Sequence, residues 1–171
     1  MKRRSASKAS RTPPEPLTYF TDRDLAKKFP AILREAGLSV VPYRQVFPDD
    51  PTIPDREWIR TACQRGWVSL THDSATRKEE DTLDEVFRDW DPSGALFILK
   101  GGIPTQQLAE MFLEGQGKVE RMVRKHRRRQ DPFIGRIRRM SRKGGRQAVE
   151  VLRWADREAW RTQKRKRRRQ R

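Results

Sequence analysis

The chain of 171 residues has a single cysteine, Cys63, and no long hydrophobic run. One cysteine excludes a disulfide framework and a zinc site built from several thiolates. This usage fits a reducing compartment, and we expect the protein in the cytoplasm. No segment approaches the roughly 18 consecutive apolar residues of a membrane-spanning helix, so we expect no membrane partner.

Hydrophobic residues are also scarce, at 34% of the chain, and the scarcity is concentrated at the two ends. Residues 17–119 have a net charge of −4, whereas residues 1–16 carry +4 and residues 120–171 carry +17. The chain is therefore an acidic body with basic ends. Basic surfaces of this size bind nucleic acid by neutralising phosphates, and bind anionic membranes less specifically. A solvated tail that only keeps the protein soluble is the competing interpretation for residues 164–171.

The composition divides the chain into a folded body and two tails. Residues 1–16 contain Ser, Pro and basic residues with almost nothing to bury, which predicts a disordered basic arm. Segments with the spacing of strands and helices follow up to residue 153, and residues 154–171 are expected to form a basic C-terminal tail. We therefore expect one folded domain over residues 17–153.

Strand-like and helix-like segments alternate along this domain. Strands are expected at residues 17–21, 38–43, 67–72 and 94–100, and helices at residues 25–36, 55–65, near 82–90, and from Pro104 into "RMVRKHRRR". Because each parallel crossover needs an intervening helix, this order predicts an α/β fold, with a small parallel sheet and helices on both faces. "PFIGRIRRM" and "QAVEVLRW", with Gly144 and Gly145 between them, predict a closing β-hairpin.

Acidic residues follow the predicted strands, where a parallel sheet collects its ligands. Asp22 and Asp24 follow the first strand, and Asp73 follows the third. Asp55 opens the helix before the third strand. At 100° per residue Asp55 continues the buried stripe of this helix, whereas Glu57 points away from it. A helix N-cap is the alternative role of both Asp24 and Asp55.

Carboxylates brought together in this way repel one another and raise one another's pKa unless a cation neutralises them. Hard oxygen ligands select Mg²⁺ or Mn²⁺, which makes these acids candidate metal ligands. Such an ion lowers the pKa of bound water and stabilises a phosphodiester under attack. The sequence therefore favours a metal-dependent nuclease in which the basic tract lies beside the acidic site. His126 lies within that tract and is expected to be solvated.

Two stretches, "YFTDRDLAKKFPAILREAGLSVVPYRQVF" and "IPDREWIRTACQRGWVSLTHD", resemble the PIN-like domains of VapC-type toxins in the order of their strands, helices, glycine and acids. The resemblance extends less tightly through "GALFILKGG" to "PFIGRI" and covers residues 17–153. PIN domains are Mg²⁺- or Mn²⁺-dependent nucleases that usually act on RNA. The resemblance therefore implies a metal-dependent ribonuclease.

The resemblance also implies which residues form the site. It places the metal-binding, catalytic acids at Asp22, Asp55 and Asp73, with Asp24 as a catalytic companion and Glu57 as a weaker substitute for Asp55. The usual fourth acid has no clear counterpart. "EEDTLDE" contains Asp81 and Asp84, but neither lies on a recognisable element.

Basic residues near the acids and in the C-terminal half are the candidates for holding a nucleic-acid strand. They are Arg23, Arg77, Lys78, Arg124, Lys125, Arg127, Arg128 and Arg129. For Arg23, Arg77 and Lys78, a surface charge that balances the acids is an equal alternative.

The sequence therefore predicts a metal-dependent endoribonuclease of PIN-like fold, with the toxin of a toxin–antitoxin pair as its biological role. The expected partners are RNA, a cognate antitoxin protein and a second copy of the chain. Two alternatives remain open at this point. One is a nucleic-acid-binding protein without catalysis, and the other is a DNA-directed nuclease with the same site.

Overall fold

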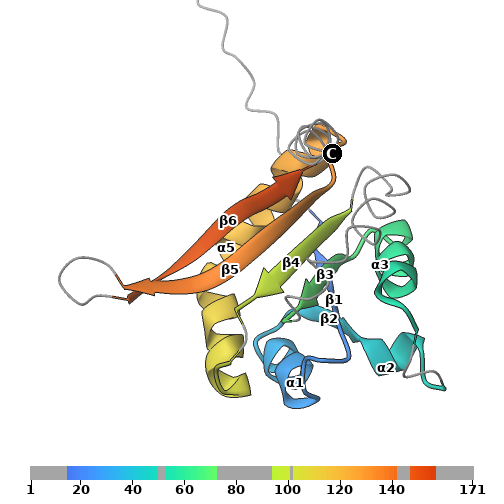
Figure 1. Ribbon diagram of the computed structural model, residues 1–171, viewed down its shortest axis with the longest axis horizontal. Coiled ribbons are helices and arrows are strands. Elements are labelled where there is room, and N and C mark those ends of the chain that lie inside the picture. The colour runs from blue at the N-terminus through green and yellow to red at the C-terminus, as the bar shows by residue number, and fades with distance from the viewer. Residues whose placement is uncertain (1–14, 50–52, 73–93, 101, 142–146, 157–171) are drawn as a thin grey trace, which may run out of the picture.

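One sheet organises the computed structural model, which describes residues 15–49, 53–72, 94–100, 102–141 and 147–156 (Figure 1). The strands are β1 (Thr18–Thr21), β2 (Ser39–Pro42), β3 (Val68–Thr71), β4 (Ala95–Leu99), β5 (Phe133–Ser141) and β6 (Gln147–Asp156). Their spatial order is β2-β1-β3-β4-β5-β6. Every neighbouring pair is parallel except β5 and β6, which are antiparallel. The predicted parallel sheet and closing hairpin are confirmed.

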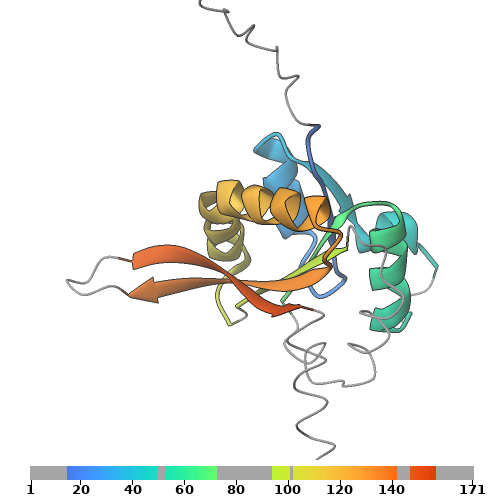
Figure 2. The ribbon, with the colours of Figure 1, turned by 90° about the horizontal axis from the view of Figure 1, so that it is seen from above.

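Helices cover both faces of the sheet, as predicted. The helices of the described segments are α1 (Lys28–Glu35), α2 (Tyr43–Val46), α3 (Asp55–Gln64) and α5 (Thr105–Arg128). The first and last of these lie side by side on one face (Figure 2), and α2 and α3 pack on the other. The helix expected near residues 82–90 lies outside the described residues. Within the described segments, no helix has the length and hydrophobicity needed to cross a membrane.

Successive side chains of β1 point to opposite faces of the sheet and pack into two separate hydrophobic cores. The ring of Tyr19 meets Phe112 of α5 edge-on at 5.3 Å, on the face covered by α1 and α5. The next residue, Phe20, stacks on Trp58 of α3 at 5.6 Å, on the other face. Both β1 side chains are fully buried. A strand buried on both faces is typical of a parallel sheet.

Two helices end at the glycines that the sequence indicated. Gly37 and Gly66 have φ values of 84° and 67°, in the left-handed region that glycine adopts at little cost. The second predicted strand ends one residue earlier than expected, at Pro42, because the short helix α2 begins at Tyr43. Tyr43 is buried in that helix rather than continuing the strand.

Helix α5 carries the chain from the carboxyl ends of the parallel strands back to their amino ends. It follows β4 and ends just before β5, where the main-chain nitrogen of Phe133 donates to the carbonyl of Gly94 at 3.3 Å. His126 near this end is 4% exposed, and its ring lies 4.2 Å from that of Phe133. The expectation of a solvated His126 is therefore wrong, because α5 turns this side chain onto the sheet.

Gly135 in β5 gives a test of this packing. A Cβ atom added there would overlap the ring of Phe97 in β4, whereas one added at Gly117 of α5 would meet nothing within 4 Å. We expect Gly135→Ala to lower the free energy of unfolding by about 1–3 kcal/mol through overpacking. Gly117→Ala should raise it by up to about 1 kcal/mol, because alanine is the better helix former. Urea unfolding of both variants measures the difference, and equal stabilities would contradict the β4–β5 packing.

Candidate functional site

Asp22 lies at the carboxyl edge of the sheet, directly after β1. Its main-chain nitrogen donates to the carbonyl of Leu70 in β3 at 2.9 Å, so the strand pairing fixes its position. The Thr71 hydroxyl donates to Oδ2 of Asp22 at 2.8 Å, and the main-chain nitrogen of Arg23 donates to Oδ1 at 2.6 Å. The residue as a whole is only 2% exposed. The predicted strand-end position of Asp22 is therefore observed.

The surroundings of Asp22 disfavour its charge. Burial raises the pKa of its carboxyl group to about 6, and the carboxylates of Asp24 and Asp55 raise it as well. The hydrogen bonds from Thr71 and from the main chain of Arg23 act in the opposite direction. Among the described residues, no lysine or arginine side chain lies within ion-pair distance of Asp22. Asp22 is thus a buried acid near two further acids, with no cationic partner in the part of the chain that the structure describes.

Asp55 is the first residue of α3 and turns toward the same region. Its side chain is 17% exposed, and its Oδ1 accepts a hydrogen bond from Nε1 of Trp58 at 2.9 Å. The guanidinium of Arg23 lies 3.8 Å from the same oxygen. The N-cap residue of α3 is Pro54, so the capping role considered for Asp55 is wrong. Glu57 is exposed, as its position on the helix predicted.

The other predicted acids divide into one that the structure describes and several that it does not. Asp24 is exposed and acts electrostatically on Asp22. Its capping role is wrong, because the N-cap residue of α1 is Lys27. The remaining predicted residues Asp73, Arg77, Lys78, Asp81 and Asp84 lie outside the described residues. Their roles stay predictions.

The described acids fit a hard divalent cation only in part. Asp22 and Asp55 offer carboxylate oxygens, and the pKa of Asp22 is raised by burial first and by the neighbouring acids second, two effects that a bound cation would oppose. Within the described segments, no group of three His, Cys, Asp or Glu side chains is arranged to hold a metal ion. The third predicted ligand, Asp73, follows β3 by two residues and lies just beyond the described segment. The three-acid metal site therefore stays a prediction.

A pocket of about 430 Å³ opens beside Asp22 and collects basic side chains. Its lining includes Lys27, Arg34 and Arg44 in addition to the predicted Arg23. Arg34 is held in place, since its guanidinium donates twice to the carbonyl of Val40, at 3.0 and 2.7 Å. The sequence analysis missed these three cations. The seven-residue spacing of Lys27 and Arg34, which places them on one helix face, was the available signal.

The basic residues at the end of α5 lie at the opposite edge of the sheet. Arg124 donates to the carbonyl of Glu15 at 2.9 Å, and Arg127 donates to the carbonyl of Gly66 at 2.6 Å. These carbonyls precede β1 and β3, whereas Asp22 follows β1. The prediction that this tract lies beside the acids is therefore wrong for Arg124, Lys125, Arg127, Arg128 and Arg129. The physical reason is the length of α5, whose 24 residues make about 36 Å of helix and carry the chain from the carboxyl edge of the parallel strands back to their amino edge.

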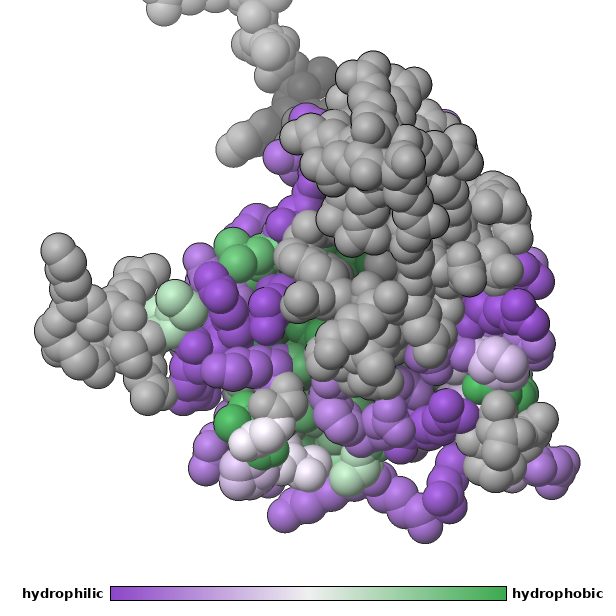
Figure 3. Space-filling model, viewed as in Figure 1, coloured by the Kyte–Doolittle hydropathy of each residue, from purple (hydrophilic) through white to green (hydrophobic). Residues whose placement is uncertain are grey.

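Arginines of β5 lie on the sheet face that holds Asp22. Thr71 is in register with Ile98 of β4, and Ile98 is in register with Arg136 of β5. At about 4.8 Å per strand, Arg136 lies about 10 Å from Thr71 on the same face. Arg138 shares this face and forms an ion pair with Glu150 at 2.9 Å. Figure 3 views the molecule from this side and shows hydrophilic side chains beside the hairpin where grey atoms do not cover it.

The comparisons with known proteins agree with this architecture. Residues 17–89 match the family model described as a PIN-like domain. The mostly parallel sheet with helices on both faces is consistent with such a fold, and the match supports a PIN-like domain of nuclease-type fold over this segment. The predicted resemblance to PIN-like domains is confirmed, while its VapC subtype stays a prediction. No curated protein and no solved structure shows a significant match to the chain.

The buried charge of Asp22 predicts a pH-dependent cost to stability. The pKa is about 6 in the folded protein and near 3.9 in an unfolded chain, so the cost is absent below about pH 4 and complete above about pH 6. Asp22→Asn removes the charge, and its amide can donate to the Thr71 hydroxyl. We expect this variant to be more stable than the parent at pH 7 by up to about 3 kcal/mol, because each pKa unit corresponds to about 1.4 kcal/mol.

Urea unfolding in the absence of divalent metal, at pH 7 and at pH 4, measures this difference. The two proteins should become equally stable at pH 4. Glu57→Gln removes an exposed carboxylate from α3 and serves as the control, with little change expected at either pH. An Asp22→Asn variant less stable than the parent at pH 7 would show that the charge is accommodated.

Proposed function

We propose that this protein is a metal-dependent endoribonuclease that acts as the toxin of a toxin–antitoxin pair. The observation that carries the proposal is Asp22, a buried acid without a cationic partner among the described residues, at the sheet edge beside a pocket lined by cations. An acid kept in this environment costs stability, and such costs are typical of functional sites. The nuclease-type fold of the family supports the same class of reaction.

In this proposal Asp22, Asp55 and Asp73 hold Mg²⁺ or Mn²⁺. A divalent ion there would lower the pKa of a water molecule and offset the charge that develops on the phosphodiester during attack. Thr71 and the main chain of Arg23 fix the orientation of the Asp22 carboxylate through their hydrogen bonds. Arg23 also restrains Asp55, at 3.8 Å. Ligand geometry thus depends on β3 and α3 as well as on β1.

The pocket beside Asp22 supplies the substrate contacts in this proposal. Lys27, Arg34 and Arg44 line it together with Tyr43. Their cations would bind the phosphates that flank the scissile bond, and Arg34 is already positioned by its bonds to Val40. Arg136 lies on the Asp22 face two strands away from Thr71 and would contact the strand farther along.

RNA is the proposed substrate because PIN domains usually act on it. A cognate antitoxin is the proposed protein partner, with the cytoplasm as the proposed location and a homodimer as the proposed assembly. Expression with and without the product of a small neighbouring reading frame tests the antitoxin. Relief of growth arrest by that product is the expected result, and arrest that persists would remove this part of the proposal.

The nuclease activity has a direct test in single-site variants. We expect the parent to cleave labelled single-stranded RNA with Mg²⁺ or Mn²⁺ and not with EDTA. The rate of RNA cleavage should fall about 100-fold or more in each of Asp22→Asn and Asp55→Asn, because a lost carboxylate oxygen weakens metal binding and catalysis. Glu57→Gln is the matched control on α3 and should cleave like the parent, since its side chain points away from the site.

The same measurement on single-stranded DNA of matching sequence separates the ribonuclease from a DNA-directed nuclease. Circular dichroism confirms that each variant is folded. RNA cleavage that survives Asp22→Asn, or that proceeds in EDTA, would refute the proposed mechanism. Binding without cleavage under every metal condition would instead support the non-catalytic alternative.

A further inference from the structure

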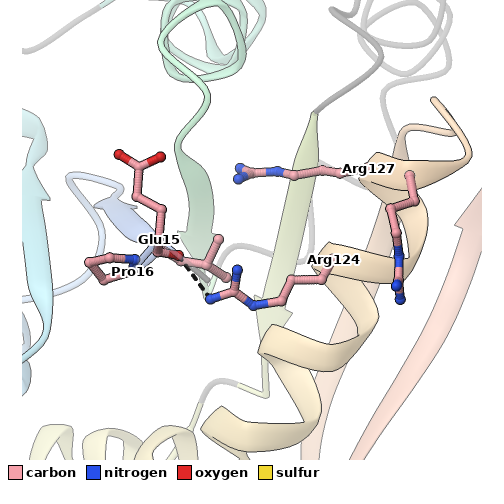
Figure 4. A pocket seen from close by; sticks show the side chains of 6 residues that line it. Glu15, Pro16, Arg124 and Arg127 are labelled. Carbon is pink, nitrogen blue, oxygen red and sulfur yellow. Dashed lines mark hydrogen bonds between the residues drawn. The ribbon is translucent and has the colours of Figure 1, made fainter. Parts of the chain in front are cut away.

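A second pocket lies at the opposite edge of the sheet from Asp22. It has a volume of about 410 Å³ and is lined by Glu15, Pro16, Leu17, Arg124, Arg127 and Arg128. Figure 4 shows the guanidinium of Arg124 extending from α5 to the carbonyl of Glu15, before β1, while that of Arg127 extends toward the start of β3. The pocket therefore lies between the end of α5 and the start of the first strand.

The arginines of this pocket are held in place without losing their charge. Arg124 and Arg127 are half-buried, and each donates to a main-chain carbonyl, of Glu15 and Gly66 respectively. A bond to a neutral carbonyl orients a guanidinium and does not itself neutralise it. Neither Arg124 nor Arg128 forms an ion pair with a carboxylate of the described segments.

The positive charges of Arg124 and Arg127 act on the nearby phenol of Tyr19. Burial and the carboxylate of Glu120 raise the pKa of the Tyr19 phenol, and Arg124 and Arg127 act against that rise. Glu15 contributes the only acidic side chain among the residues that line the pocket. The pocket thus suits an anion.

We propose that this pocket binds a phosphate group of a single-stranded nucleic acid, separately from the acidic site. Arginine forks match the geometry of phosphate oxygens, and guanidinium groups already fixed by carbonyl bonds lose little freedom on binding. The inference rests on the proposed function for the class of ligand. It adds a contact that holds the strand without taking part in its cleavage.

The separation of the two sites determines what each affects. Leu17 lines the arginine pocket and Asp22 follows the same strand five residues later, about 17 Å away at 3.3–3.4 Å per residue. A nucleic acid that reaches both sites passes around the sheet, because the pocket lies beside α5 and Asp22 lies on the face covered by α3. It therefore presents more than about five phosphates at 3.4 Å each, if its bases are stacked. The arginine pocket therefore contributes to affinity and leaves the chemical step unchanged.

The test is a binding measurement on the full chain in EDTA, which excludes metal-dependent cleavage. The probes are fluorescently labelled single-stranded RNA and DNA of the same sequence, roughly 20 nucleotides long so that both sites are covered. Arg128→Gln removes an exposed cation of the pocket, and Lys125→Gln removes an exposed cation of α5 that does not line it. Each variant removes one positive charge from an exposed position near the end of α5.

We expect Arg128→Gln to weaken binding of both probes about 3- to 10-fold. The slope of the logarithm of the binding constant against the logarithm of the salt concentration should fall in magnitude by the amount of about one phosphate contact. Lys125→Gln should have a smaller effect on both quantities. Glu15→Gln should tighten binding, because it removes the acid from the pocket rim. Equal losses in Arg128→Gln and Lys125→Gln, or no loss in Arg128→Gln, would overturn the proposal. So would a loss confined to RNA, since phosphates are common to both probes.

An acidic peptide is the competing ligand for a cluster of arginines. A competition experiment measures whether polyglutamate displaces labelled RNA from the parent with the same efficiency as unlabelled RNA, and fails to do so in Arg128→Gln. That result would assign the pocket to a protein partner and overturn the proposal. The outcome is also distinct from that of the nuclease test. If Arg128→Gln weakens binding but the parent cleaves no RNA, the pocket proposal stands and the nuclease proposal fails. If the parent cleaves RNA but Arg128→Gln binds it normally, the nuclease proposal stands and the pocket proposal fails.

Discussion

The pairing of β1 with β3 is the constraint on which the acidic site depends. The main chain of Asp22 continues this pairing by one residue, through its bond to Leu70. The same register brings the Thr71 hydroxyl within 2.8 Å of the Asp22 carboxylate. Because the neighbouring ladder bonds cannot shift independently, the carboxyl group is kept in a buried position that it would otherwise leave for water. The site is therefore built into the sheet rather than carried by a loop.

The two-sided core determines how α3 contributes to this site. Trp58, Ile59, Ala62 and Cys63 are buried against the sheet, and this stripe sets the rotation of the helix. Asp55 lies one turn before Ile59 on the same side, and its bond from Trp58 ties the acid to the core. Packing energy that comes from apolar residues thus also positions a carboxylate. Arg23 joins the two acids by lying next to Asp22 in sequence and within 3.8 Å of Asp55 in space.

The fold was predictable from the sequence because its signals are local. Gly37 and Gly66 end helices, apolar runs mark the buried strands, and the order of elements leaves a parallel sheet as the simple solution. The site was predictable where an acid follows a strand or occupies a helix stripe, as at Asp22 and Asp55. The capping roles of Asp24 and Asp55 were wrong, because Lys27 and Pro54 occupy those positions. Cap positions depend on local dihedral angles that composition does not specify.

The sequence by itself determined the strand-end position of Asp22, the orientation of Asp55 and Glu57 on their helix, and the excess of basic residues after residue 120. Only the tertiary structure decided where those basic residues lie. Helix α5 runs from the carboxyl ends of the parallel strands to their amino ends, so Arg124 and Arg127 reach the amino edge. Lys27, Arg34 and Arg44 instead line the pocket beside Asp22. The number of charges in a segment does not show where those charges lie in the fold. The length and packing of α5 determine their position.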